Sequence, residues 1–129
     1  MKGFLTLAEV CARTGISAHT LRYYERAKLL KGIGRQRNGH RIYTERDLQW
    51  ITILQILRGT GMPIRKILAL SEMVDAGDAS LEDRIAFFRA YQDELRRQID
   101  MRERAIATLE AKIGIHAAKL CKRNKDTAK

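Results

Sequence analysis

The feature that most constrains this chain is an apolar repeat through its C-terminal half. Steps of four and three residues alternate from position 81 to position 120, and nine of the twelve repeat positions are apolar. No proline interrupts the segment, so the pattern predicts one long helix with a coiled-coil seam. The predicted dimerisation residues on this seam are Leu81, Ile85, Phe88, Leu95, Ile99, Ile106, Leu109 and Ile113.

A seam of this length needs a partner. A helix of about 40 residues extends roughly 60 Å, and the rest of a 129-residue chain is too small to cover it. The same helix of a second copy is the simplest partner, so we expect a homodimer. An antiparallel pair places Arg102 opposite Ile99, whereas a parallel pair would bring Arg102 against its own copy. The antiparallel arrangement is therefore predicted.

The end of the seam is predicted to be weak. Gly114 costs a helix roughly 1 kcal/mol relative to alanine, so we expect a break there. Beyond residue 120 the sequence CKRNKDTAK is basic and reads as a flexible tail.

The charge of the chain indicates its kind of partner. A formal net charge of +10 and an isoelectric point near 10.1 favour a polyanion, with nucleic acid first and an anionic membrane surface second. No apolar run reaches the roughly 18 residues of a membrane span, and Glu9 and Arg13 interrupt the N-terminal stretch where a signal peptide would lie. We therefore expect a cytoplasmic protein without a membrane partner. Cys11 and Cys121 form no metal-ligand pair, and neither a metal nor a cofactor is predicted.

Two short helices begin the chain. The capping box from Thr6 to Glu9 starts a helix that stops at Gly15, and Ser17 caps a second one. The short turn between them predicts a helix-turn-helix. Polar residues on one face of the second helix favour DNA contacts, although an ordinary solvated helix face is the alternative. These residues are His19, Thr20, Arg22, Arg26 and Lys28.

A charged hairpin follows and favours the DNA interpretation. Asn38-Gly39 predicts a two-residue type I′ turn between strands at 33–37 and 40–43. A helix-turn-helix followed by a basic hairpin is a winged helix, and we interpret the hairpin as a DNA clamp. From Ile16 to Arg46 there are eight basic and two acidic residues, so the positive charge is concentrated around the second helix and the wing.

Two more helices complete the predicted N-terminal domain. A capping box at Thr44 starts one helix that stops near Gly61, and Pro63 starts another that closes at Gly77. The predicted organisation is mainly α. A winged helix-turn-helix domain spans 1–77, an antiparallel coiled-coil dimerisation helix spans 78–120, and a basic tail spans 121–129.

Three stretches of the sequence resemble the MerR-type transcription regulators in their order and spacing. They are ISAHTLRYYERAKLL, RNGHRIYTERDLQWI and Gly-Met-Pro-Ile. The resemblance implies that the helix at 17–27 lies in the major groove and that wing residues hold the DNA backbone. The implied DNA-binding residues are Ser17, His19, Thr20, Arg22, Tyr23, Arg26, Arg35, Asn38, Gly39, His40, Arg41 and Tyr43. Two alternatives stay open, that Tyr43 belongs mainly to the core and that Arg41 mainly pairs with Glu25. Lys28 stands where the family usually has glycine, so a strained or reshaped helix exit is expected.

The resemblance also implies a mechanism. A homodimer would bind a dyad-symmetric promoter site on the bacterial nucleoid and distort an overlong spacer, acting on RNA polymerase indirectly. Length and the element LQWITILQILRGTGMPI are most similar to the short branch that responds to aldehydes or thiol stress. Ile56 occupies the position of that branch's cysteine, which excludes thiol sensing through this site. No metal-sensing cysteines or appended drug-binding domain are expected, and the effector is unknown.

Two other classes of protein stay open beside a regulator. An architectural DNA-bending or recombination-directionality protein would use the same reader and dimer without an effector, and its sites would lie away from promoters. A coiled-coil adaptor would leave the Asn38-Gly39 hairpin unexplained. An enzyme is not predicted, because the sequence supplies no nucleophile with its base, no paired-carboxylate cleft and no glycine-rich phosphate loop.

Overall fold

The computed structural model describes residues 3–128 and is mainly helical, with one small sheet. A compact N-terminal unit ends at Arg84, and a second unit begins at Ile85. The elements in chain order are β1 (Phe4–Thr6), α1 (Leu7–Thr14), α2 (Ala18–Arg26), β2 (Gly34–Arg35), β3 (Arg41–Thr44), α3 (Glu45–Gly59), α4 (Ile64–Asp75), the 3₁₀ helix η1 (Gly77–Ser80) and α5 (Leu81–Thr127). The predicted fold class, a winged helix-turn-helix followed by a long helix, is confirmed.

The sheet has three antiparallel strands in the order β1-β3-β2. Leu5 of β1 pairs with Tyr43 of β3, and Gly34 of β2 pairs with Ile42 on the other side. Only the wing hairpin was predicted, because the three residues of β1 are too few to show the period-two alternation of a strand. Strand β1 joins the start of α1 to the base of the wing.

The turn of the wing differs from the predicted type I′ turn. The Gly39 amide donates to the Gln36 carbonyl at 2.9 Å, and the Gln36 amide donates to the His40 carbonyl at 2.8 Å. Gly39 has a φ of 85°, whereas among the described non-glycine residues only Lys28 has a positive φ. The connection is thus a three-residue loop with glycine in the left-handed region. The Asn38 carboxamide oxygen accepts from the His40 amide at 3.0 Å, a bond that closes the turn without a left-handed Asn38.

The first two helices form as their caps predict. The Thr6 hydroxyl accepts from the Glu9 amide and the Glu9 carboxylate accepts from the Thr6 amide, both at 3.1 Å. Gly15 ends α1 with a φ of 74°. The Ser17 hydroxyl accepts from the Thr20 amide at 3.1 Å and so starts α2.

The exit of α2 carries backbone strain at Lys28. The Leu29 amide donates to the Tyr24 carbonyl at 2.9 Å and the Lys28 amide donates to the Glu25 carbonyl at 3.1 Å, which is the Schellman pattern. This pattern needs a left-handed residue, and Lys28 supplies it with a φ of 64°. A side chain in that conformation costs roughly 1–2 kcal/mol, so the predicted strained exit is found.

Replacing Lys28 by glycine should stabilise the fold. We expect Lys28→Gly to raise the free energy of unfolding by about 1 kcal/mol, because glycine adopts a positive φ without a steric cost. Thermal unfolding followed by circular dichroism measures the change. Lys28→Ala is the matched control, because it removes the same charge but keeps a Cβ, and it should not stabilise. Equal melting temperatures for the two variants would contradict the role assigned to the backbone.

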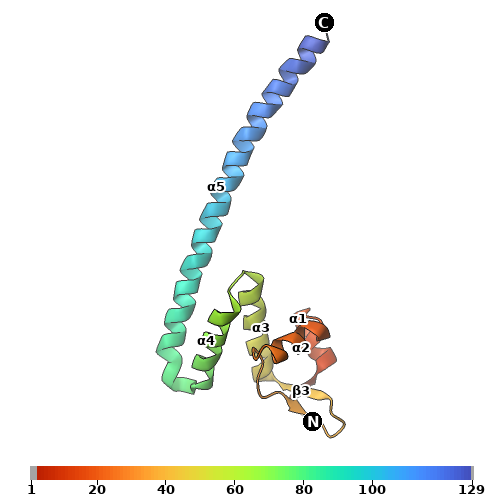
Figure 1. Ribbon diagram of the computed structural model, residues 1–129, viewed down its shortest axis with the longest axis vertical. Helices are drawn as coiled ribbons and strands as arrows, with labels where there is room; N and C mark the ends of the chain where they lie inside the picture. Colours follow the sequence, from red (N-terminus) through yellow and green to blue (C-terminus); the bar gives the residue numbers. More distant parts are fainter. Residues whose placement is uncertain (1–2, 129) are drawn as a thin grey trace. The chain divides into compact units, whose positions relative to one another are not determined.

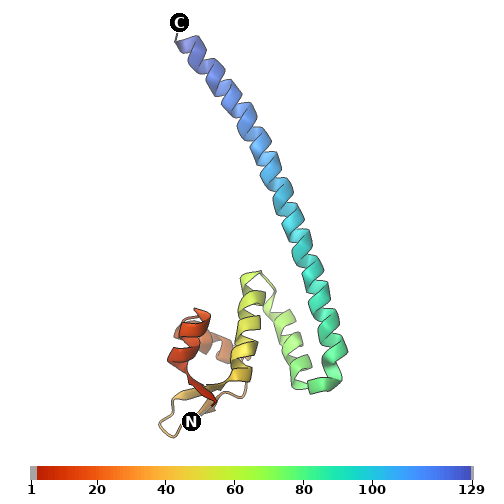
Figure 2. The same ribbon diagram turned by 180° about the vertical axis from the view of Figure 1, so that it is seen from behind.

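The core of the N-terminal unit lies where α3 and α4 meet the small helices and the sheet. Figures 1 and 2 show α3 and α4 side by side, joined by the turn at Gly61. The predicted capping box at Thr44 is present, with the Asp47 amide donating to the Thr44 hydroxyl at 3.0 Å and the Thr44 amide to the Asp47 carboxylate at 2.9 Å. The largest fully buried side chains are Tyr43, Leu21, Leu29, Ile51, Leu54, Ile67, Leu70 and Val10.

The long helix α5 has 47 residues and continues through Gly114. The predicted break is therefore wrong: one glycine costs roughly 1 kcal/mol, and no proline accompanies it. The helix also includes Cys121 to Thr127, so the predicted basic tail is helical as far as Thr127.

Residue Ser80 joins the start of α5 to α4. Its hydroxyl donates to the carbonyl oxygens of Met73 and Gly77 and accepts from Arg84 Nε at 3.0 Å. Arg84 also donates from Nη2 to the Gly77 carbonyl at 2.9 Å. These bonds keep the first turn of α5 in the N-terminal unit, which reaches Arg84.

Candidate nucleic-acid interface

Helix α2 presents a positive, exposed face. This face contains three exposed residues, His19, Arg22 and Arg26. Tyr23 is 40% exposed. Ser17 and Thr20, which were also predicted to contact DNA, are hydrogen-bonded to each other through their hydroxyls at 3.0 Å. The apolar side of the helix is fixed in the core by Leu21, which is 1% exposed. The polar face is thus held outward by the packing of the opposite face.

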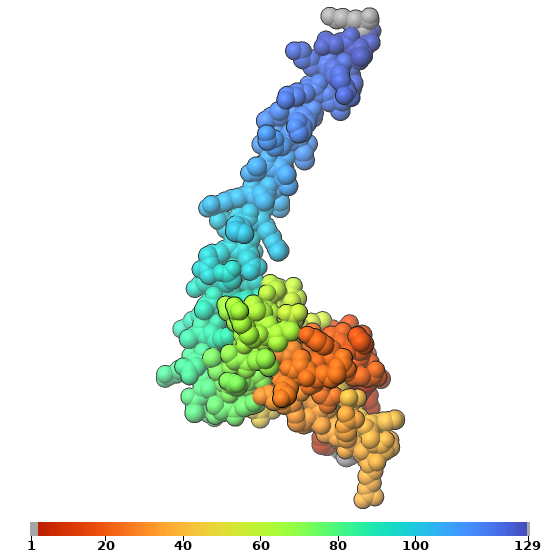
Figure 3. All heavy atoms as spheres, in the orientation of Figure 1, coloured from red at the N-terminus to blue at the C-terminus, as the bar shows by residue number. Residues whose placement is uncertain are grey.

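The wing lies beside this helix. The loop around residues 36–40, gold in Figure 3, projects from the surface of the N-terminal unit. Within it, Arg35 Nη1 donates to the Gly39 carbonyl at 3.0 Å. Arg35 and Asn38 therefore both support the turn, and both are exposed, as are Arg37 and His40.

A cavity of about 450 Å³ joins the helix and the wing. It brings together four of the predicted DNA-binding residues, Arg22, Gly39, His40 and Arg41. Thr6, Leu7, Ala8 and Gln36 complete the lining. The start of α1 was not predicted to take part, because its position depends on β1, which the sequence pattern did not reveal. Two arginines and a histidine around one opening suit the sugar-phosphate backbone of a duplex.

An ion pair crosses from α2 to β3 inside this surface. Arg41 Nε lies 2.7 Å from the Glu25 carboxylate, and the two side chains are 21% and 27% exposed. Glu25 is the only acid in α2. Of the two readings left open for Arg41, pairing with Glu25 is the one observed.

The prediction that Tyr43 contacts DNA is wrong, because its side chain is 1% exposed. Burial raises the pKa of the Tyr43 hydroxyl above its usual value of 10.0, since the phenolate would lose its hydration, while nearby Arg41 opposes that shift. A neutral tyrosine packed beneath the Glu25–Arg41 pair belongs to the core. Within β3, only Tyr43 is buried.

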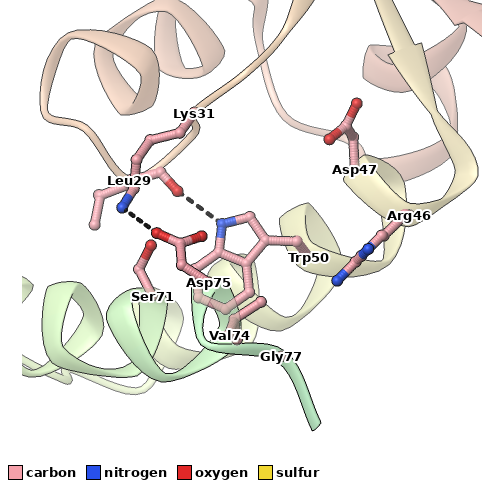
Figure 4. Close-up of a pocket in the computed structure, with 9 residues that line it drawn as sticks. All are labelled: Leu29, Lys31, Arg46, Asp47, Trp50, Ser71, Val74, Asp75 and Gly77. Atoms are coloured by element: carbon pink, nitrogen blue, oxygen red, sulfur yellow. Dashed lines mark hydrogen bonds and ion pairs between the residues drawn. The ribbon is translucent and has the colours of Figure 1, made fainter. Parts of the chain in front are cut away.

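The segment that joins α2 to the wing is fixed on α3 and α4. As Figure 4 shows, the Trp50 indole donates to the Leu29 carbonyl, at 2.7 Å, and Lys31 Nζ lies 2.6 Å from the Asp75 carboxylate. These contacts border a cavity of about 330 Å³. They set the path of the chain from the end of the helix to the start of the wing.

Removing the Trp50 hydrogen bond should loosen this segment. We expect Trp50→Phe to lower the free energy of unfolding by about 1–3 kcal/mol, because the Leu29 carbonyl loses its donor in a partly buried place. Lys31→Ala is the comparison, and it should cost less than about 1 kcal/mol because the Lys31 and Asp75 side chains are 45% and 59% exposed. Denaturant unfolding followed by circular dichroism distinguishes the two. A larger loss of unfolding free energy for Lys31→Ala than for Trp50→Phe would show that the ion pair, rather than the indole hydrogen bond, fixes this segment.

The predicted seam of α5 is a second candidate surface. No residue of α5 is buried. Exposed fractions along the seam include 49% for Ile85, 56% for Ile106 and 66% for Ile113. A regular row of exposed apolar side chains of this kind is characteristic of an association surface.

Residues 3–128 contain neither a membrane-spanning helix nor a cluster of metal ligands. No helix in this range is long and apolar enough to cross a bilayer. Within the same residues, no three His, Cys, Asp or Glu side chains gather as a metal site.

Together, the helix-turn-helix, the basic hairpin beside it and the shared positive cavity define a winged helix-turn-helix DNA-binding protein. Comparison with known proteins gives the family. The model of the MerR HTH family of regulatory proteins matches residues 5–73. The chain belongs to the MerR family and is a DNA-binding transcription regulator of that type.

Three similar proteins refine the comparison. An uncharacterized HTH-type transcriptional regulator of Haemophilus influenzae is 36% identical over 111 residues, which are 86% of this chain and 82% of the relative. The regulator AdhR of Bacillus subtilis is 34% identical over 80 residues, 62% of this chain and 57% of AdhR. The crystal structure of HiNmlR, described as a MerR family regulator lacking the sensor domain and bound to promoter DNA, superimposes with a TM-score of 0.72. It is 36% identical and covers 80% of this chain and 78% of its own.

Proposed function

We propose that this protein binds a dyad-symmetric promoter site as a homodimer and controls transcription by bending or untwisting an overlong promoter spacer. The observation that carries the proposal is the cavity in which Arg22 of α2 meets Gly39, His40 and Arg41 of the wing region. A duplex backbone seated there would place the exposed face of α2 against the major groove. His19, Arg22, Tyr23 and Arg26 would make the contacts.

The exposed seam of α5 supplies the second half of the proposal. Two copies joined antiparallel along this seam present two winged helices, which need half-sites about one helical turn, or a multiple of it, apart. A dimer that grips both half-sites can impose a shape on the base pairs between them, and the deformation energy of those base pairs then adds to specificity.

Three considerations support the promoter as the target. The chain is a MerR-type regulator, HiNmlR is bound to promoter DNA in its crystal structure, and a distorted spacer changes the alignment of the two promoter elements. RNA polymerase is then affected through the shape of the DNA rather than through direct contact. In this proposal the protein works on the nucleoid, in the cytoplasm of a bacterial cell.

Transcription in vitro tests the mechanism. A promoter that the protein binds is prepared with its natural spacer and with spacers shortened by about one and two base pairs, and transcripts are counted with and without the protein. The proposal predicts that the protein's effect depends on spacer length and disappears at the length that RNA polymerase prefers. An equal effect at every spacer length would overturn the proposal and favour simple occlusion of the promoter.

A further inference from the structure

One charged pair in the DNA-binding surface has no evident use in binding DNA. Glu25 lies among the cations of α2 and pairs with Arg41 of β3 at 2.7 Å. A carboxylate so close to the phosphates repels them and occupies an arginine that would otherwise be available to the backbone. A surface selected only for affinity would replace this glutamate.

The pair links two elements of the proposed DNA-binding surface. It joins the last turn of α2 to the first residue of β3, and Arg41 also lines the cavity between helix and wing. Glu25 and Arg41 lie close enough to buried Tyr43 to act on the pKa of its hydroxyl, so the pair borders the core. The side chains are 21% and 27% exposed, so solvent screens their attraction less than in a fully exposed pair.

The other ion pair between elements of the first half offers a contrast. Arg13 of α1 and Glu45 of α3 lie 3.2 Å apart, with side chains 51% and 59% exposed. Neither residue lines the cavity between α2 and the wing. This pair therefore has the same chemistry in a solvated place outside the proposed DNA contact.

We propose that Glu25 is a specificity-determining positioning residue. It fixes the wing against the recognition helix through Arg41, and it withholds one positive charge per subunit from DNA of arbitrary sequence. Affinity for random duplexes is thereby reduced, while the spacing between helix and wing that the correct site requires is kept. This inference rests on the proposed function, because it concerns the same DNA-binding surface.

The test compares two duplexes and two variants. One duplex carries a site that the wild-type protein selects from genomic DNA, and the other has a scrambled sequence of the same composition. Glu25→Gln is compared with Glu45→Gln, which removes the same charge and also breaks a pair with arginine. Dissociation constants are measured by fluorescence anisotropy over a range of salt concentrations, after circular dichroism has shown that each variant is folded.

For Glu25→Gln we expect about tenfold tighter binding to the scrambled duplex. The dependence of log K on log salt should steepen by about 0.9 for each subunit, the value for one additional phosphate contact. Binding to the selected site should change less than about threefold, so the preference for that site falls about tenfold. Glu45→Gln should leave the preference within about twofold of wild type.

A charge swap separates position from charge. Glu25→Arg combined with Arg41→Glu restores a pair and the net charge, and it should restore most of the preference that Glu25→Gln loses. Equal shifts for both duplexes in Glu25→Gln, or a swap no more selective than the single variant, would overturn the proposal. If the wild type selected no site at all, the proposed function would fail, but the scrambled-duplex salt dependence would still decide whether Glu25 withholds a charge.

Discussion

Replacing Ile106 by glutamate should separate the proposed homodimer and abolish tight DNA binding. Ile106 lies in the middle of the seam and is 56% exposed in the single chain. In the antiparallel arrangement it faces Leu95 of the second copy. Each of the two equivalent sites would lose about 1.5–3 kcal/mol of burial and would also have to desolvate a carboxylate. The dimerisation constant should therefore fall at least about a hundredfold.

A monomer carries only one winged helix, so it can bind only one of the two half-sites at a time. The remaining monomer should bind one half-site with the weak affinity of a single module. Sedimentation velocity gives the association state, and anisotropy gives the affinity. Met101→Glu is the matched control, because Met101 is 69% exposed and lies off the seam on the same helix. A dimer that survives Ile106→Glu, or an equal fall of the dimerisation constant in both variants, would contradict the role of the seam in dimerisation.

Replacing Arg22 by alanine should cause the largest loss of affinity among changes within the DNA-binding surface. Arg22 is exposed on α2 and lines the cavity shared with the wing. One arginine contact to a base or phosphate is worth about 1–3 kcal/mol, and a dimer makes the contact twice. Arg22→Ala should therefore weaken binding about thirtyfold or more, without a change in melting temperature.

The control for this prediction removes an arginine elsewhere. Arg96 of α5 pairs with Asp93 at 3.3 Å, and its side chain is 69% exposed. Arg96→Ala should change the dissociation constant less than about threefold at the same salt concentration, which must be fixed because affinity for DNA depends on salt. Equal losses for Arg22→Ala and Arg96→Ala would show that overall charge, rather than the cavity beside the wing, determines binding.

The parts of the fold that were predictable are those whose signals are local. The capping boxes at Thr6 and Thr44, the helix stop at Gly15 and the strained exit at Lys28 each depend on residues a few positions apart. The long helix was predictable because its apolar repeat is long. That the segment after residue 120 is flexible stays a prediction, since a basic composition alone does not decide it.

The site was predictable in its elements but less so in its details. The positive face of α2 and the basic hairpin were evident, whereas the contribution of α1 depends on the short strand β1. The inward direction of Tyr43 follows from the register of β3 on its neighbours, which the sequence did not specify. Whether Arg41 faces DNA or Glu25 is likewise decided by tertiary packing.

Genome-wide capture of DNA fragments by the purified protein tests the central claim most directly. The proposed function predicts dyad-symmetric sites whose half-site centres lie about one helical turn or a multiple of it apart, located between the two elements of promoters with overlong spacers. Captured fragments without a dyad, or dyads scattered away from promoters, would contradict it and would identify an architectural DNA-binding protein instead.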